Sequence, residues 1–136
     1  QTKAMKKVAG KLRLELAQFR ELQAFVQFSA DVDPATRQKI ARGRMMTEVL
    51  KQSELRPLPF EQQVLVLYAA LNGYFGQAAL EQIGSIQEKL LEYVADFYRD
   101  VLEGLRDKKE ITPEIESRMK SAIEAFMKEY EQLAKH

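Results

Sequence analysis

The chain has 136 residues, of which 46% are hydrophobic and 30% are charged, so it is long enough for one domain with its own core. The net charge is +1, which lacks the basic excess that nucleic-acid-binding domains usually carry. Cysteine is absent and the single histidine is His136, which excludes disulfides, thiolate metal sites and a histidine-based catalytic triad.

The first predicted element is an amphipathic helix over residues 2–28. Its start is rich in lysine, which we interpret as a solvated face rather than an anion site because exposed lysine is ordinary on helices. Its apolar residues recur three and four positions apart, as on one face of an α-helix: Val8, Leu12, Leu16, Phe19, Leu22, Phe25 and Val26.

A second helix is predicted over residues 34–52, because Asp33 before Pro34 is typical of an N-cap followed by proline at the first helical position. Its start carries four positive charges with no acid among them. Two interpretations remain open, a solvated face or a contact with an acidic neighbour in an assembly. The four residues are Arg37, Lys39, Arg42 and Arg44.

A third helix is predicted over residues 60–72, and it is apolar nearly all round. A helix of this kind is buried, so other helices of the chain must surround it. Its apolar run from Val64 to Ala70 is far shorter than the roughly 20 residues that cross a bilayer, so no membrane insertion is expected. Asn72 and Gly73 end the helix, because glycine accepts the left-handed conformation.

The remainder of the chain predicts two more helices. One long amphipathic helix is expected over residues 80–105, and Thr112 with Pro113 begins a last helix that reaches Leu133. No segment alternates with the period of a strand. The pattern therefore predicts an all-α bundle of five to seven helices with one buried central helix.

Residues that could carry chemistry are few. There is no GxxxxGK phosphate loop, and the paired carboxylates Asp31 and Asp33 lie in a turn, where aspartate is expected for capping. The isolated segment is therefore expected to catalyse no reaction and to hold no cofactor or metal. From the residues alone, one candidate function is a stand-alone helical adaptor that binds a partner helix in a groove.

Four words of the sequence, QTKAMK, LELAQFREL, VLKQ and YAALNGYF, occur in this order between Gln1 and Phe75. In these words the chain resembles the C-terminal domain of the alpha subunit of rotary proton-translocating ATP synthase. From residue 76 onward the resemblance is one of pattern and length only.

The resemblance implies that residues 1–136 are a non-catalytic helical domain of a longer subunit, preceded by a barrel and a nucleotide-binding domain. The parent subunit would hold ATP or ADP with magnesium at a non-catalytic site. Its partners would be the catalytic beta subunits and the central rotating shaft, in the head that couples ATP synthesis or hydrolysis to proton transport. That complex would lie peripheral to an energy-coupling membrane, on the cytoplasmic side of a bacterial plasma membrane or its organelle equivalent.

The resemblance also implies roles for single residues. Gln52 matches the first glutamine of the family's KQxQ pattern, which lends side chains to the adenine pocket of the non-catalytic site. Glu54 stands where the family has a second glutamine, and an ionised carboxylate accepts hydrogen bonds but cannot donate them. Asp31 and Asp33 lie in the loop FSADVDPAT, which matches the turn that faces the shaft, although the usual Gly-Ser of that turn is Ser-Ala here.

Overall fold

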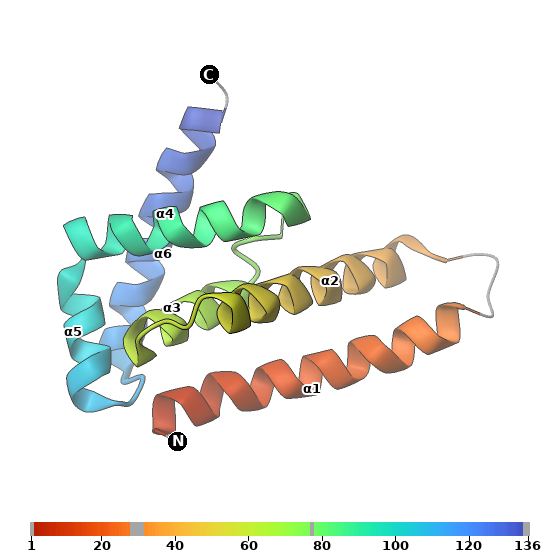
Figure 1. Cartoon of the computed structure of the whole chain (residues 1–136), viewed down its shortest axis with the longest axis horizontal. Helices are drawn as coiled ribbons and strands as arrows, with labels where there is room; N and C mark the ends of the chain where they lie inside the picture. The colour runs from red at the N-terminus through yellow and green to blue at the C-terminus, as the bar shows by residue number, and fades with distance from the viewer. Residues whose placement is uncertain (1, 28–31, 77, 135–136) are drawn as a thin grey trace.

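The computed structural model describes residues 2–27, 32–76 and 78–134, and the regular structure of these residues is entirely helical. This confirms the predicted all-α bundle. The elements are α1 (Lys3–Val26), α2 (Pro34–Leu55), α3 (Phe60–Leu71), the short 3-10 helix η1 (Leu80–Gln82), α4 (Ile83–Phe97), α5 (Arg99–Lys108) and α6 (Pro113–Ala134) (Figure 1).

Helix α3 lies at the centre, and every residue from Val64 to Leu71 is buried. It contacts α1, α2, α4 and α5, which confirms the predicted buried helix. Gly73 has a φ of 79°, a left-handed conformation that favours glycine, and it ends the helix as predicted.

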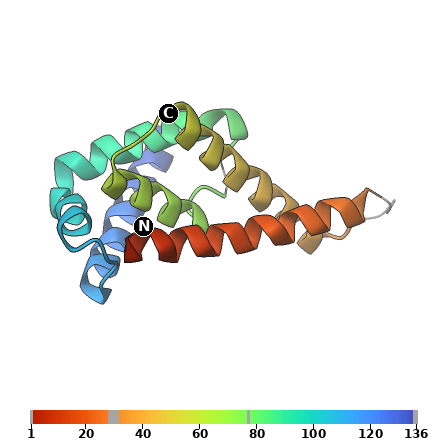
Figure 2. The ribbon, with the colours of Figure 1, turned by 60° about the horizontal axis from the view of Figure 1, so that its bottom comes forward.

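Helices α1 and α2 form an antiparallel hairpin that extends beyond α3. The hydroxyl oxygen of Thr2 accepts a hydrogen bond of 3.2 Å from the backbone N–H of Met5 and begins α1. The two helices are close at the hairpin end and diverge toward the other end, where α3 lies between them (Figure 2). The buried residues of α1 are Ala4, Val8, Leu12 and Leu16.

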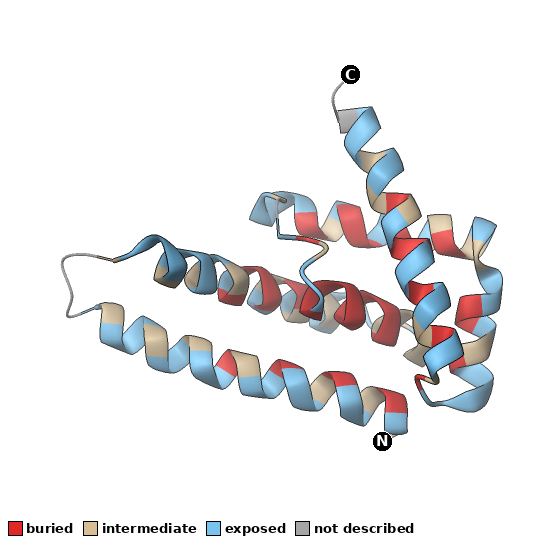
Figure 3. Cartoon of the chain, turned by 180° about the vertical axis from the view of Figure 1, so that it is seen from behind, coloured by how far each residue is buried: buried red, intermediate tan, exposed pale blue. Residues whose placement is uncertain are grey.

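The second half of the predicted apolar stripe of α1 is only partly covered. Phe19 and Leu22 are half-buried, and the side chain of Phe25 is 70% exposed. The projecting half of the hairpin is therefore largely solvent-exposed (Figure 3). The period of the sequence identified the correct face of the helix but could not show that α3, at 12 residues, is too short to cover its whole length.

The prediction of a single long helix over residues 80–105 is wrong. The chain bends at Tyr98, whose φ of −138° and ψ of 43° are not helical, so that α4 and α5 are separate. A straight helix of this length would span about 39 Å, whereas α3 spans about 18 Å. The bend lets α4 pack on α2 and α6 while α5 turns onto α3 and α6.

Helix α6 begins as predicted, because the side-chain oxygen of Thr112 accepts a hydrogen bond of 3.2 Å from the N–H of Ile115. The preceding turn holds Lys109 at a φ of 55°. The carbonyl of Lys109 accepts a hydrogen bond of 3.1 Å from the N–H of Ala4, which joins this turn to the start of α1. The last turns of α6 project beyond the other helices, and Leu133 is 70% exposed there (Figure 1). No helix in the described ranges is long and apolar enough to cross a membrane.

Candidate functional site

The site residues predicted from the sequence lie along α2. Asp33 is the N-cap of this helix, and its carboxylate accepts a hydrogen bond of 2.8 Å from the N–H of Thr36. Hydrogen bonding from Thr36 and the charge of Lys39 hold the pKa of Asp33 below its usual value. Asp31 lies outside the described residues. Asp33 therefore begins the helix, as the proline after it predicted, and its expected contact with a shaft stays a prediction.

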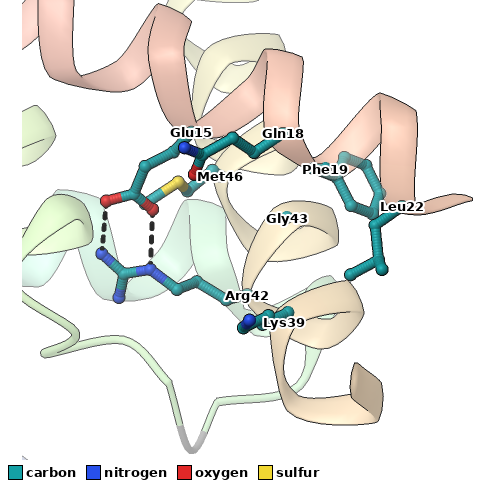
Figure 4. A pocket seen from close by; sticks show the side chains of 8 residues that line it. All are labelled: Glu15, Gln18, Phe19, Leu22, Lys39, Arg42, Gly43 and Met46. Carbon is teal, nitrogen blue, oxygen red and sulfur yellow. Dashed lines mark hydrogen bonds and ion pairs between the residues drawn. The ribbon is translucent and has the colours of Figure 1, made fainter. Parts of the chain in front are cut away.

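Arg42 is held by two other helices. Its Nε donates to Oε2 of Glu15 over 2.8 Å and its Nη2 donates to Oε1 over 3.1 Å, which is the bidentate geometry of a strong ion pair (Figure 4). Nη2 also donates to the carbonyl oxygen of Leu71 at the end of α3. The guanidinium thus joins α1, α2 and α3 at one point.

The contact with Leu71 completes the C-terminus of α3. The last four carbonyls of a helix have no partner within it. Here the carbonyl of Tyr68 accepts from Asn72, that of Ala69 from the N–H of Tyr74, and that of Ala70 from the N–H of Gly73. The Leu71 carbonyl is the fourth, and a cation is favourable at this negative end of the helix dipole.

Glu15 is a functional neighbour that the sequence analysis did not find. It lies 27 residues from Arg42 on a different helix, so no local pattern connects the two residues. Among the described residues no ion pair includes Arg37, Lys39 or Arg44, which are exposed. The predicted contact of Arg42 and Arg44 with an acidic partner stays a prediction, and Arg42 now has an internal partner as well.

The surface beside Arg42 is hollowed on the hairpin. The close approach of the helices depends on Gly43, because a Cβ atom there would lie 2.2 Å from the ring of Phe19. A cavity of about 560 Å³ lies between α1 and α2 (Figure 4). Lys39 and Arg42 line it with positive charge, and Glu15 supplies one carboxylate. The hollow therefore presents one net positive charge from these three groups.

Gln52 and Glu54 are at the opposite end of α2, and the structure does not bring their side chains together. They are separated by about 200° around the helix, because successive residues turn by about 100°. Gln52 is half-buried, and its amide donates to Oε1 of Glu48 over 2.9 Å. The amide oxygen Oε1 of Gln52 faces Gly84 of α4, and a Cβ atom added to Gly84 would lie only 3.0 Å from that oxygen. Glu54 is exposed.

The end of α2 is fixed to its neighbours on both sides of Gln52. Nε2 of Gln63 on α3 donates to the hydroxyl of Ser53 over 2.9 Å. Arg56 pairs with Glu88 on α4. The Gln52 side chain therefore lies at the junction of α2 and α4, with its amide bound to Glu48 and placed against Gly84.

A comparison with known families matches residues 1–126 to the ATP synthase alpha/beta chain, C terminal domain. The chain belongs to this family.

In this ATP synthase alpha/beta C-terminal domain, the match ends within α6, so the last turns of that helix lie outside it. The family is part of the nucleotide-binding ATP synthase subunits. The described residues contain no group of three or more histidine, cysteine or acidic side chains placed to hold a metal ion. The Gln52 amide contacts Glu48 and Gly84, and its contact with adenine stays a prediction.

Two tyrosines connect the centre of the domain to α6. Tyr68 donates its hydroxyl to Glu116 over 2.8 Å, and Tyr74 donates to Glu124 over 3.2 Å. Burial, together with the hydrogen bond to Glu116, raises the pKa of Tyr68 well above its usual range. These hydrogen bonds join α3 and the turn after it to α6.

Proposed function

We propose that this domain is the C-terminal domain of an ATP synthase alpha subunit, with a non-catalytic role in the catalytic head. Gln52 contributes to the adenine pocket of the non-catalytic nucleotide site, and the hairpin loop that contains Asp31 and Asp33 faces the rotating shaft. Nucleotide phosphates and magnesium are held by an upstream domain of the same subunit. The catalytic beta subunits and the shaft are its partners, in a complex peripheral to an energy-coupling membrane.

The observation that carries this proposal is the arrangement of the expected contacts along α2. Asp33 and Gln52 are separated by 19 residues of one continuous helix, which is about 28 Å. The start of α1 and the end of α2, the helix that carries Gln52, both lie at the end of the hairpin away from Val26 and Pro34 (Figure 1). A domain that precedes α1 would therefore lie toward the end of the hairpin that carries Gln52, and Asp33 lies at the other end. This separation supports a nucleotide contact at one end of α2 and a shaft contact at the other.

The test uses the full-length subunit that contains this chain, coexpressed with its catalytic partners. Gln52→Ala is expected to weaken adenine nucleotide binding at the non-catalytic site by about two- to thirteen-fold, the loss of one neutral hydrogen bond. Gln38→Ala is the matched control, because this exposed glutamine lies on the same helix far from Gln52. Bound nucleotide would be measured in the purified complex after removal of the free ligand.

Two outcomes would contradict the proposal. Equal nucleotide affinity in Gln52→Ala and in Gln38→Ala would remove Gln52 from the pocket. Failure of the subunit to purify with catalytic partners would favour the alternative function, a stand-alone helical adaptor.

A further inference from the structure

An open groove with an aromatic floor lies between α4 and α6. Its volume is about 530 Å³. Tyr93 is at the centre of the floor, with its ring centroid 4.9 Å from that of Phe97 and 5.7 Å from that of Phe126. Tyr130 continues the floor, 5.8 Å from Phe126. Leu133 also lines the groove, and the side chains of Leu133 and Phe97 are 70% and 68% exposed.

The rim of this groove is acidic. Glu92, Asp96 and Glu129 line it, against a single lysine. That lysine, Lys89, has its ammonium 5.6 Å from the ring centroid of Tyr130, so its charge is already placed over an aromatic face. No ion pair between described residues uses any of the three acids. Burial, and to a smaller extent the charge of Glu129, raise the pKa of Tyr93.

Part of the groove lies beyond the residues that match the family. Glu129, Tyr130 and Leu133 come from the turns of α6 beyond the last matched residue, 126. These turns project past the other helices (Figure 1). Phe97 and Leu133 are exposed in the groove, Tyr93 and Tyr130 are half-buried, and Phe126 is buried. Exposed apolar side chains that lie beside further aromatic surface in one groove mark an interaction surface, whereas scattered single exposures need no partner.

We propose that the α4–α6 groove binds a basic amphipathic helix of a partner protein. An apolar stripe of that helix packs on Tyr93, Phe97 and Leu133, and lysine or arginine on its flanks meets the acidic rim. A helix is favoured because the groove lies between two helices, and an amphipathic helix packs its apolar face into a groove of this kind. Charge complementarity selects a basic partner, and it disfavours nucleic acid and anionic membrane surfaces, which the three carboxylates repel.

The probe is a helical peptide composed of leucine and lysine at amphipathic spacing, with one tryptophan on its apolar face. The chain contains no tryptophan, so emission from the peptide reports its binding without background. Binding to the 136-residue chain is expected to weaken as salt rises, because the rim charges are solvent-exposed. Phe97→Ala is expected to weaken it by about five-fold or more, as for an aromatic anchor.

The matched control is Phe25→Ala, an equally exposed phenylalanine on α1 that does not line the groove. It is expected to leave affinity unchanged. Asp96→Lys tests the rim separately from the floor and is expected to weaken binding and reduce its salt dependence. Circular dichroism melts of each variant confirm that exposed substitutions leave the fold intact.

Several results would overturn the proposal. The proposal is wrong if a peptide with glutamate in place of lysine binds as well as the basic peptide. It is also wrong if the Phe97→Ala variant binds the basic peptide as tightly as the unmodified chain does. An equal loss of affinity in the Phe25→Ala variant would show that the peptide binds exposed apolar surface in general. Self-association in sedimentation experiments that Phe97→Ala abolishes would assign the groove to a second copy of the chain instead.

Discussion

Replacing Arg42 by methionine removes one charge and all its donors while it keeps an unbranched apolar stem in place. Glu15 on α1 then loses its partner, and the carbonyl of Leu71 at the end of α3 loses its only hydrogen bond from a charged group. The two losses differ in size. A hydrogen bond from a charged group contributes about 1.5–3 kcal/mol, whereas an exposed ion pair contributes about 0.2–1 kcal/mol.

The contribution of the Arg42 contacts to the free energy of unfolding is expected to lie between these two values. The side chains of Arg42 and Glu15 are 34% and 33% exposed, so water compensates part of each loss. We therefore expect Arg42→Met to lower the free energy of unfolding by about 2 kcal/mol, most of it from the Leu71 contact. For a chain of this size that corresponds to a melting temperature lower by about 8 °C.

The assay is urea unfolding of the 136-residue chain followed by circular dichroism. Arg44→Met is the control, because Arg44 is exposed and in no ion pair among the described residues, and it is expected to change stability by less than about 0.5 kcal/mol. The double variant with Glu15→Gln measures the coupling between the two residues. Equal stability of Arg42→Met and Arg44→Met would refute the role of Arg42 as the residue that joins three helices.

Two further substitutions test the packing. Gly43→Ala is expected to destabilise the chain by about 1–3 kcal/mol, since its Cβ would meet the ring of Phe19. Gly10→Ala, with nothing within 4 Å of its Cβ, should stabilise the chain by up to about 1 kcal/mol in the same unfolding assay. Equal effects of the two substitutions would contradict the close approach of the helices at Gly43. Tyr68 has a raised pKa, so its contribution to stability is complete below about pH 10, its unfolded value, and is lost as pH rises above that. Tyr68→Phe should therefore cost about 1 kcal/mol at neutral pH and reduce the alkaline loss, measured by unfolding at several pH values, and an unchanged alkaline loss would show that another group titrates.

Local signals in the sequence predicted most of the fold correctly. The caps of α1, α2 and α6 are set by residues within three positions of each helix start. Asp33 and Thr112 were identified from the sequence because a proline follows each of them. The burial of α3 followed from its uninterrupted apolar surface. These features depend on neighbours in the sequence, which is why their positions were correct to within a few residues.

Features that depend on distant residues could not be predicted. The bend at Tyr98 lies within a continuous apolar stripe, and only the short length of α3 makes a straight helix unsuitable. The pairing of Arg42 with Glu15 and the placing of Gln52 against Gly84 each depend on how two helices cross. Sequence analysis could therefore name Gln52 and Arg42 as candidate site residues but could not predict what surrounds them.

The hydrogen bond between Ala4 and Lys109 has a consequence for the order in which the chain folds. It connects residues separated by 105 positions, whereas the α1–α2 hairpin and the contacts of α5 with α6 connect residues that are near in sequence. Contacts across short loops form first, because closing a longer loop costs more chain entropy. Seating the first turn of α1 against the turn after α5 is thus expected to be a late step of folding. Because this contact contributes little to the stability of the folding transition state, a substitution that weakens the contact will speed unfolding far more than it slows refolding.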